Sequence, residues 1–314
     1  MKLALLGFWL PAFAGLTGCS ERPAIETETI RIVSLNPCTD AILAEIAPEK
    51  LAAVSHYSHD PAASSMDVAK ARRWPATAGT VEEIAALEPD LVVASTFLSP
   101  ATSQAFERLG FRVARIGMTA TVEDSIAQIR ELAALAEAKD EGERLVAEIE
   151  AALAAANGTG DPVPALVWQA GGIVPGEGTL IVDLLRRTGF AHAAAARGLG
   201  QADRLPLEAV LADPPALILA AGSAHAEQDR ALFHPALAAL EDTRRARLDP
   251  SLLYCGGPTI IRAAERLAEI RADLPSRRRE GLGVGMDRAR PIPLRLGRYR
   301  SQASLPLPLA GGGV

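Results

Sequence analysis

The stretch 140–157, DEGERLVAEIEAALAAAN, contains no proline and sets Leu145, Val146, Ile149 and Leu153 at helical spacing on one apolar stripe. A helix of this length spans about 27 Å, which is long enough to run along two lobes. On both sides of it, short apolar runs alternate with helical patterns, as is typical of parallel sheets. The sequence therefore predicts an α/β fold of two lobes with parallel β-sheets flanked by helices, joined by one long spine helix. A long connector helix inside one continuous domain is the alternative.

An internal match favours two similar lobes. Residues 81–94 (VEEIAALEPDLVVA) align without gaps with residues 207–220 (LEAVLADPPALILA). Each segment is typical of a short helix with an acidic residue near its start, a proline turn and a buried strand. The identical positions are few, so chance convergence on a common helix–turn–strand pattern is the alternative. Together with the spine helix, the match predicts two lobes related by a pseudo-twofold.

Caps, prolines and apolar runs place the individual elements. Thr80 and the pair Thr121 and Asp124 are expected to begin two helices, and Thr39 or Asp40 a third. We predict strands over residues 31–35, 51–54, 91–94, 112–116, 165–168, 217–220 and 251–254. We predict helices over residues 41–47, 81–87, 101–109, 122–136, 180–187, 207–211, 236–240 and 258–272. The N-terminal lobe then covers residues 30–138, the spine 139–157 and the C-terminal lobe 158–274.

The two ends of the chain differ from the rest. Residues 1–19 form an apolar run that ends in LTGC, which resembles a bacterial lipobox and predicts an export signal with lipidation at Cys19. Cleavage after the AFA of residues 12–14 is the alternative, and in both cases we expect the mature protein on the periplasmic side. Residues 20–29 form a polar tether, and the basic, Pro- and Arg-rich residues 275–314 predict a disordered tail. The net charge of −6 gives no indication of nucleic-acid binding.

Several segments, in this order and spacing, resemble the periplasmic solute-binding proteins of ABC importers for vitamin B12, ferric siderophores and haem, whose two lobes are joined by one helix. The segments are RIVSLNPCTD (31–40), VEEIAALEPDLVVAS (81–95), FERLGF (106–111), GTLIVDLLRRTGF (178–190), LPLEAVLADPPALILAAG (205–222) and YCGGPTIIRAAERLAEI (254–270). The resemblance covers about residues 30–274. It implies a two-lobe α/β fold with a ligand held between the lobes.

The resemblance also implies partners. Loaded members of the family dock on a membrane permease dimer driven by its ATPase, and an acidic residue on each lobe meets basic residues of the permease. The matching positions here are Glu82 and Glu208, which the internal repeat also aligns. An ordinary solvated residue, favoured in a first helical turn by the helix dipole, is the alternative for each. We expect a monomer, held at the membrane through a lipid anchor, with no cofactor of its own and no enzymatic activity.

Ligands of open α/β sheets bind beyond the carboxyl ends of the strands. That rule, applied to the predicted strands, nominates aromatic and polar residues that could contact a large ring. The aromatic candidates are Tyr57, Phe97 and Trp168, with packing in the core or in a loop as the alternative for each; the polar candidates are Asn36 and Gln169. Cobalamin is the first expected ligand, and a ferric siderophore or haem is the alternative.

Cys38 and Cys255 each follow a predicted strand, one in each half of the chain. They could bind a metal-bearing cofactor through sulfur, form a disulfide in an oxidising compartment, or be two small buried residues. A disulfide across the cleft would hinder its opening, which argues against that pairing. We therefore include both cysteines among the candidate ligand-binding residues.

Three further functions are weaker alternatives. A bare-metal binding protein would need His and carboxylate ligands, but Asn36-Pro37-Cys38 stands where related zinc and manganese importers place a histidine after the first strand. His56 or His59 could instead be an axial ligand to haem iron or cobalt. An enzyme with Cys38 as nucleophile and one of these histidines as base has no local motif to support it. A sensor or scaffold lipoprotein with a degenerate cleft is the third.

Overall fold

A computed structural model of the chain describes residues 29–222 and 227–274. The predictions for the signal segment, for Cys19 and for the tail 275–314 concern residues outside these ranges. Both sheets of the structure belong to one compact unit that ends at Leu274. Within the described residues, no helix is long and apolar enough to cross a membrane.

The first sheet has five parallel strands in the order β3-β2-β1-β4-β5. Its central strands are short apolar runs whose side chains are almost all buried, as expected for a parallel sheet covered on both faces. The strands are β1 (Ile32–Ser34), β2 (Leu51–Ser55), β3 (Ala76–Thr77), β4 (Leu91–Ser95) and β5 (Val113–Ile116). Four of the five match predicted strands, and β3 is too short to give a sequence signal.

The second sheet has four parallel strands in the order β7-β6-β8-β9. They are β6 (Val163–Gln169), β7 (Phe190–His192), β8 (Leu217–Ala221) and β9 (Arg244–Arg247). Its order repeats the order β2-β1-β4-β5 of the first sheet, so that β4 and β8 occupy equivalent places. The two aligned helix–turn–strand segments, residues 81–94 and 207–220, therefore occupy equivalent positions in the two halves of the fold. Parallel sheets in both halves, flanked by helices, confirm the predicted fold class.

Most helices begin where local capping chemistry places them. Thr80 accepts a hydrogen bond from the backbone N–H of Glu83, and Thr121 and Asp124 form a reciprocal capping box. The helices are α1 (Pro37–Ile46), α2 (Val68–Ala71), α3 (Val81–Leu87), α4 (Pro100–Arg108), α5 (Val122–Leu135), α6 (Lys139–Ala155), α7 (Leu180–Arg187), α8 (Leu207–Ala212) and α9 (Thr259–Ala272). Short 3-10 turns are η1 (His56–His59), η2 (Ala170–Gly172), η3 (Ala195–Arg197), η4 (Glu227–Phe233), η5 (Pro235–Ala239) and η6 (Pro250–Leu252).

Three sequence predictions about elements are wrong. Helix α1 begins at Pro37 and is capped by Asn36, not by Thr39 or Asp40, because proline suits the first helical position. The last strand is β9, whereas the predicted strand 251–254 overlaps the turn η6. Residues 244–247 read RRAR, and an edge strand with exposed arginines lacks the apolar alternation by which strands are recognised. The predicted helix 236–240 is the 3-10 turn η5.

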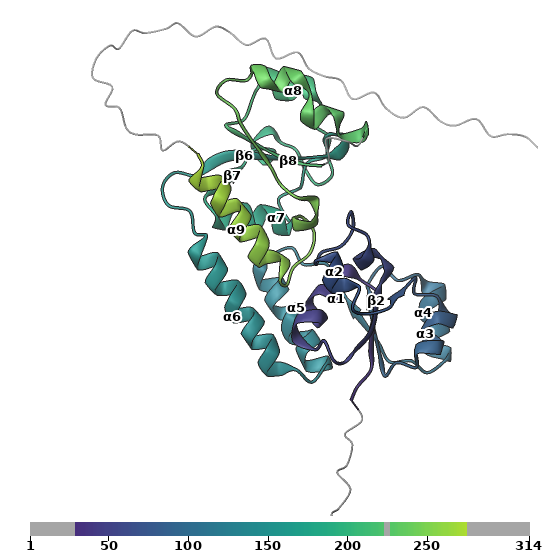
Figure 1. Cartoon of the computed structure of the whole chain (residues 1–314). Coiled ribbons are helices and arrows are strands. Elements are labelled where there is room, and N and C mark those ends of the chain that lie inside the picture. The colour runs from purple at the N-terminus through teal and green to yellow at the C-terminus, as the bar shows by residue number, and fades with distance from the viewer. Residues whose placement is uncertain (1–28, 223–226, 275–314) are drawn as a thin grey trace, which may run out of the picture. The chain divides into compact units, whose positions relative to one another are not determined.

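The predicted spine is helix α6. It buries Leu145, Val146 and Ile149 and packs against α5 and α1 from the first half of the chain and against α9 from its end (Figure 1). Gly142 allows the close approach of α5, since a Cβ there would lie 2.5 Å from the Cβ of Ala133. The helix therefore contacts elements from both halves of the chain, as the long apolar stripe predicted.

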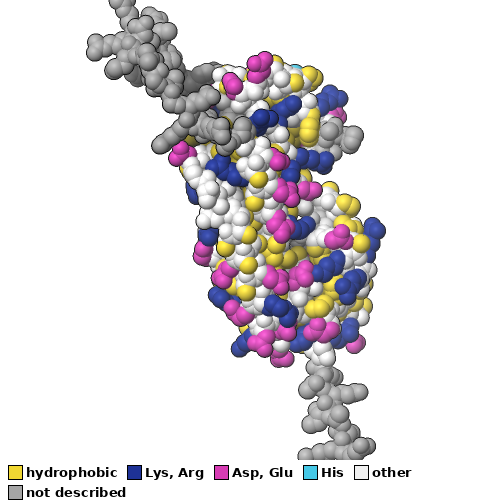
Figure 2. Space-filling model, turned by 60° about the vertical axis from the view of Figure 1, so that its left-hand side comes forward, with side chains coloured by type: hydrophobic (Ala, Val, Ile, Leu, Met, Phe, Trp, Pro, Cys, Tyr) yellow, Lys and Arg dark blue, Asp and Glu magenta, His cyan; other side chains and the backbone are white. Residues whose placement is uncertain are grey.

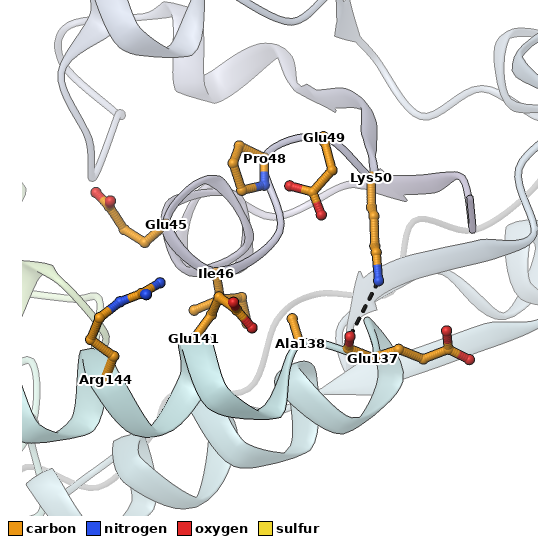
Figure 3. A pocket seen from close by; sticks show the side chains of 9 residues that line it. All are labelled: Glu45, Ile46, Pro48, Glu49, Lys50, Glu137, Ala138, Glu141 and Arg144. Carbon is orange, nitrogen blue, oxygen red and sulfur yellow. Dashed lines mark hydrogen bonds between the residues drawn. The ribbon is translucent and has the colours of Figure 1, made fainter. Parts of the chain in front are cut away.

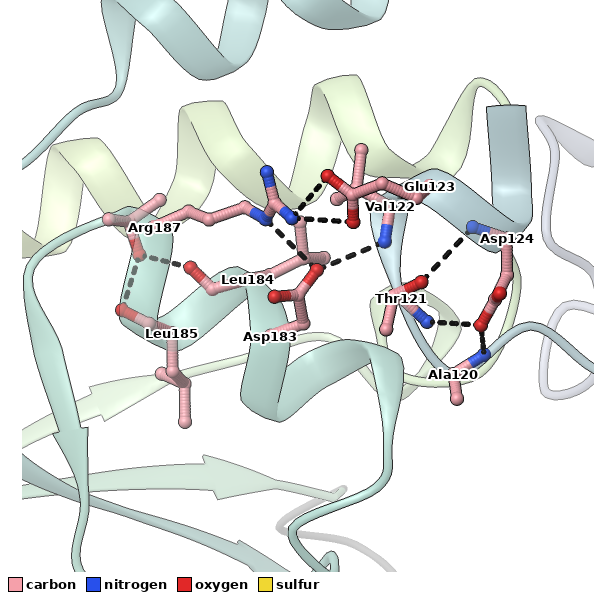
Figure 4. Close-up of polar contacts among 10 residues, drawn as sticks. Ala120, Thr121, Val122, Glu123, Asp124, Asp183, Leu184, Leu185 and Arg187 are labelled. Carbon is pink, nitrogen blue, oxygen red and sulfur yellow. Dashed lines mark hydrogen bonds and ion pairs between the residues drawn. The ribbon is translucent and has the colours of Figure 1, made fainter. Parts of the chain in front are cut away.

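A polar network joins α5 to α7 of the second half (Figure 4). Asp183 accepts a hydrogen bond from the backbone N–H of Val122 at the first turn of α5 (3.0 Å). Arg187 donates to Asp183 (2.9 Å) and to both carboxylate oxygens of Glu123 (2.7 Å each). The hydrogen bond from Arg187 holds the pKa of Glu123 below its ordinary value. A side chain of the second half thus satisfies a backbone donor at the N-terminus of α5 that the helix itself leaves free.

Candidate functional site

Apolar side chains are exposed along the carboxyl edge of the first sheet. Tyr57 follows β2, Phe97 follows β4 and Met118 follows β5, and their side chains are 50%, 76% and 76% exposed. Since the strands are parallel, all three lie at the same edge, on both sides of Asn36 after the central strand β1. Large exposed apolar side chains at one sheet edge are typical of a ligand-contact surface. Sequence analysis nominated all of these residues except Met118, whose position after a strand was the available signal.

The carboxyl edge of the second sheet presents two further candidates. Gln169 ends β6, and its side-chain oxygen accepts a hydrogen bond from the hydroxyl of Tyr254. The Tyr254 side chain is 59% exposed. Tyr254 was missed because the prediction placed it inside a strand, whereas it lies between η6 and α9. Asn36, at the first sheet, is half-buried, and its side-chain oxygen accepts the N–H of Cys38 (2.9 Å).

Trp168 does not lie on this surface, and the prediction that its ring faces a ligand is contradicted. Its side chain is fully buried, and its indole N–H donates to the carbonyl oxygen of Leu205 (2.9 Å). Leu166 and Trp168 pack in one core cluster, whereas Ala165 and Val167 pack in another. The side chain of a strand residue projects from a face of the sheet even near the carboxyl end of the strand. Trp168 projects from a face that is covered by the core.

Cys38 and Cys255 form a disulfide, with their Cα atoms 5.0 Å apart. The bond joins the first turn of α1, which follows β1, to the loop that precedes α9 after the second sheet. Neither sulfur is therefore free to bind a ligand metal, and Cys38 cannot act as a nucleophile while the bond is intact. The argument against a disulfide assumed that it would span an opening cleft, but the bond lies where the two halves are already packed together.

Two hydrogen bonds hold the same place, which we call the junction: the first turn of α1 together with residues 255–259. The N–H of Gly257 donates to Oγ of Ser125 on α5 (2.8 Å), and the hydroxyl of Thr259 donates to the carbonyl oxygen of Ser65 (3.2 Å). A Cβ on Gly256 would lie 2.3 Å from Oγ of Ser125. Gly256 and Gly257 are therefore required by close packing, since a Cβ on Gly257 would likewise lie 2.4 Å from Cγ1 of Ile42.

The junction contains a buried carboxyl group. Asp40 of α1 is fully buried, and its Oδ2 accepts hydrogen bonds from the N–H of Ser55 (2.9 Å) and the hydroxyl of Ser58 (2.6 Å). Burial raises the pKa of Asp40 to about 8, although the nearby Ser34 hydroxyl and the hydrogen bonds from Ser58 and Ser55 oppose the shift. Its Oδ1 has no hydrogen-bond partner among the described residues.

The two histidines of η1 are placed differently. Nε2 of His59 lies 3.2 Å from the carbonyl oxygens of both Ala71 and Trp74, so that ring has a structural role. His56 is exposed, its Nδ1 lies 3.3 Å from the carbonyl oxygen of Thr77, and its ring stacks beside Tyr57 with centroids 4.0 Å apart. This leaves Nε2 of His56 available to a ligand. Among the described residues, no group of three or more His, Cys, Asp or Glu side chains could hold a metal ion.

The two candidate docking residues are both exposed in the first turn of their helices, Glu82 on α3 and Glu208 on α8. The neighbouring Glu83 instead accepts hydrogen bonds from the hydroxyl of Thr77 (2.6 Å) and the N–H of Ala78 (2.8 Å). The bond from Thr77 holds the pKa of Glu83 below its ordinary value. The structure thus gives adjacent glutamates different roles and leaves Glu82 turned to solvent.

A hollow of about 340 Å³ lies away from the carboxyl ends of the strands, between the C-terminal end of α1 and the N-terminal end of α6 (Figure 3). One of its lining residues, Lys50, donates to the carbonyl oxygen of Ala136 (2.7 Å), and so caps the end of α5. The face drawn in Figure 2 carries acidic and basic side chains interspersed, without a large area of one sign. The hollow is lined by Glu45, Ile46, Pro48, Glu49, Lys50, Glu137, Ala138, Glu141 and Arg144.

Comparison with known proteins adds a family and a set of similar folds. The family model described as periplasmic binding protein matches residues 32–251. The haem-binding protein RhuT of Roseiflexus sp. RS-1 is 23% identical with a TM-score of 0.59, over 78% of this chain and 97% of that chain. HutB of Vibrio cholerae, which binds haem, is 19% identical with a TM-score of 0.63, over 77% and 98%. BtuF of Vibrio cholerae, which binds vitamin B12, is 19% identical with a TM-score of 0.54, over 78% and 98%. No curated protein matches the sequence.

We predict that the disulfide stabilises the folded chain. Replacing both cysteines, in a Cys38→Ser, Cys255→Ser variant, should lower the free energy of unfolding by about 2–4 kcal/mol, because the bond closes a long loop in the unfolded chain. Denaturant unfolding of the oxidised wild type, the reduced wild type and the variant measures this. The reduced wild type and the double variant should have the same free energy of unfolding. Equal stability of all three, or a peptide map that shows 38 and 255 unlinked, would contradict the pairing.

We also predict that Asp40 makes stability depend on pH. The pKa of Asp40 is raised from 3.8 to about 8 on folding, so between these values the folded protein keeps a proton that the unfolded chain releases. The contribution of this proton to the free energy of unfolding is therefore fully present below pH 4. It decreases as the pH rises to 8, by at most about 1.4 kcal/mol per pH unit. Unfolding free energies of wild type and Asp40→Asn between pH 5 and 8 test this. The downward slope should be smaller in the variant, and equal slopes would contradict the prediction.

Proposed function

The chain belongs to the periplasmic binding protein family, and from this premise we propose that it captures a metal-bearing macrocycle, haem or cobalamin, and delivers it to an ABC importer. The ligand would lie against the carboxyl edges of the two sheets, which the junction holds together. The observation that carries this proposal is the set of large exposed side chains at those edges. They are Tyr57, Phe97 and Met118 on the first sheet and Tyr254 on the second.

These side chains suit a large flat ligand. Aromatic rings and a thioether give apolar contact area and adapt to a ring face, while the side-chain amides of Gln169 and Asn36 can donate hydrogen bonds at the rim. Similar folds belong to the haem-binding proteins RhuT and HutB and to the vitamin B12 binding protein BtuF. Both ligands fall within the proposed class, and a ferric siderophore is the alternative outside it.

The donor groups favour haem over cobalamin, which was the first expectation from sequence. Tyr57 offers a phenol and His56 an imidazole Nε2, and both types of group are axial ligands of haem iron in proteins. The Nδ1 of His56 lies near the carbonyl oxygen of Thr77, the kind of second contact that orients a metal-binding histidine. His59 is not proposed as a ligand, because its ring nitrogen is already engaged.

We predict saturable binding of one probe among haemin, cyanocobalamin and a ferric siderophore, measured by calorimetry and by absorbance. Tyr57→Ala and Phe97→Ala should each weaken that binding by about tenfold, because each removes a ring from the contact surface. Leu109→Ala is the matched control, since Leu109 is also a large apolar side chain, 54% exposed, but lies at the end of α4. No saturable binding of any of the three probes by wild type would overturn the proposed ligand class.

Delivery to the importer would use Glu82 and Glu208, whose carboxylates are exposed at equivalent places on the two halves. The Glu82→Gln, Glu208→Gln variant should dock about tenfold more weakly, because both long-range attraction and two charged contacts are lost. The measurement is ATPase stimulation of a permease–ATPase complex that responds to wild type. Ligand affinity should not change, and Glu148→Gln, an exposed glutamate of α6, is the control. An equal effect of the control variant would contradict the assignment.

The lipid anchor at Cys19 stays a prediction.

A further inference from the structure

One oxygen of the Asp40 carboxyl group holds both ends of the turn that carries Tyr57. Oδ2 of Asp40 accepts the backbone N–H of Ser55, the last residue of β2, and also the hydroxyl of Ser58, the third residue of η1. Tyr57 lies between these two donors, and its own N–H donates to Oγ of Ser55 (3.3 Å). The exposed ring of Tyr57 therefore stands on a turn whose two ends are fixed to a single buried atom.

Burying the Asp40 carboxyl group costs free energy. Asp40 is fully buried, and its Oδ1 has no hydrogen-bond partner among the described residues. An apolar residue at this place in α1 would avoid that cost, since an unpartnered buried polar atom is destabilising. The carboxyl group is therefore best explained by what it holds, which is the turn His56–His59.

The same turn of α1 also fixes the opposite edge of the candidate site. Cys38, two residues before Asp40, is bonded to Cys255, and Tyr254 is the residue next to Cys255. Helix α1 thus reaches the Tyr57 turn through a hydrogen-bonded carboxyl and the Tyr254 loop through a covalent bond. Helix α1 therefore helps to position both aromatic side chains, although they follow strands of different sheets.

We propose that Asp40 is a positioning residue for ligand binding, which acts through Tyr57 by holding the η1 turn in a ligand-competent conformation. This inference rests on the proposed function, because it assumes that Tyr57 contacts the ligand. Asp40 itself does not touch the ligand, since it is fully buried beneath the turn. Its effect should therefore vanish when the Tyr57 ring is absent.

A double-mutant cycle on the full chain tests this, with whichever of haemin, cyanocobalamin or the ferric siderophore binds wild type as the probe. Asp40→Ala should weaken binding by about tenfold, since it removes both hydrogen bonds to the turn. Asp40→Asn keeps an acceptor oxygen and should restore most of the affinity, and Ser58→Ala should have a smaller effect than Asp40→Ala. In a Tyr57→Ala background, Asp40→Ala should have almost no further effect. Asp67→Ala is the control, because Asp67 also accepts a backbone N–H, that of Lys70, but outside this turn.

Hydrogen exchange of the amides of residues 55–60 gives a second readout that needs no ligand. In Asp40→Ala these amides should exchange at least about tenfold faster than in wild type, while those of α5 and α6 should not change. Independent, additive effects of Asp40→Ala and Tyr57→Ala on affinity, or unchanged exchange in the turn, would overturn the inference. If no probe binds wild type, the proposed function fails, and the exchange measurement alone then decides whether Asp40 orders the turn.

Discussion

The disulfide between Cys38 and Cys255 is the contact on which the arrangement of the two sheets depends. It joins the first turn of a helix in the first half to a loop from the second half, at a place where two glycines leave no room for side chains. Hydrogen bonds from that loop to α5 and to Ser65 surround it. At the start of α5, Asp183 and Arg187 of α7 bind Val122 and Glu123. The two sheets are thus coupled through α1 and α5 as well as through the spine α6.

This coupling bears on how such a protein would bind its ligand. When the contact surfaces are already held in place, binding costs less conformational entropy than when two lobes must first close. We therefore expect adjustment on binding to occur mainly in short exposed segments such as η1. Those segments carry the large apolar side chains, and buried polar contacts such as that of Asp40 with Ser55 and Ser58 order them from below. A rigid frame with a few ordered contact turns is a suitable carrier for a large, flat ligand.

Fold and ligand are determined at different levels in this family. Folds of similar topology bind haem in two of the proteins compared and vitamin B12 in the third, at 19–23% identity. The parallel sheets and the helix between them do not distinguish these ligands, because they set only where the strand ends lie. Under the proposed function, the choice of ligand would rest on the few exposed side chains at those ends, here Tyr57, Phe97, Met118 and Tyr254.

Local interactions are what the sequence by itself determined. The caps at Thr80 and at Thr121 with Asp124, the apolar stripe of α6 and the buried runs of β4 and β8 depend on neighbours within a few residues, so their patterns were readable. Three features depended on tertiary structure. Strand β9 exists because β8 offers it an edge, Trp168 is buried because it points to a packed sheet face, and Cys38 meets Cys255 because the first turn of α1 and the loop before α9 come together at the junction. Each joins residues far apart in the chain, and no periodicity or spacing in the sequence encodes such a meeting.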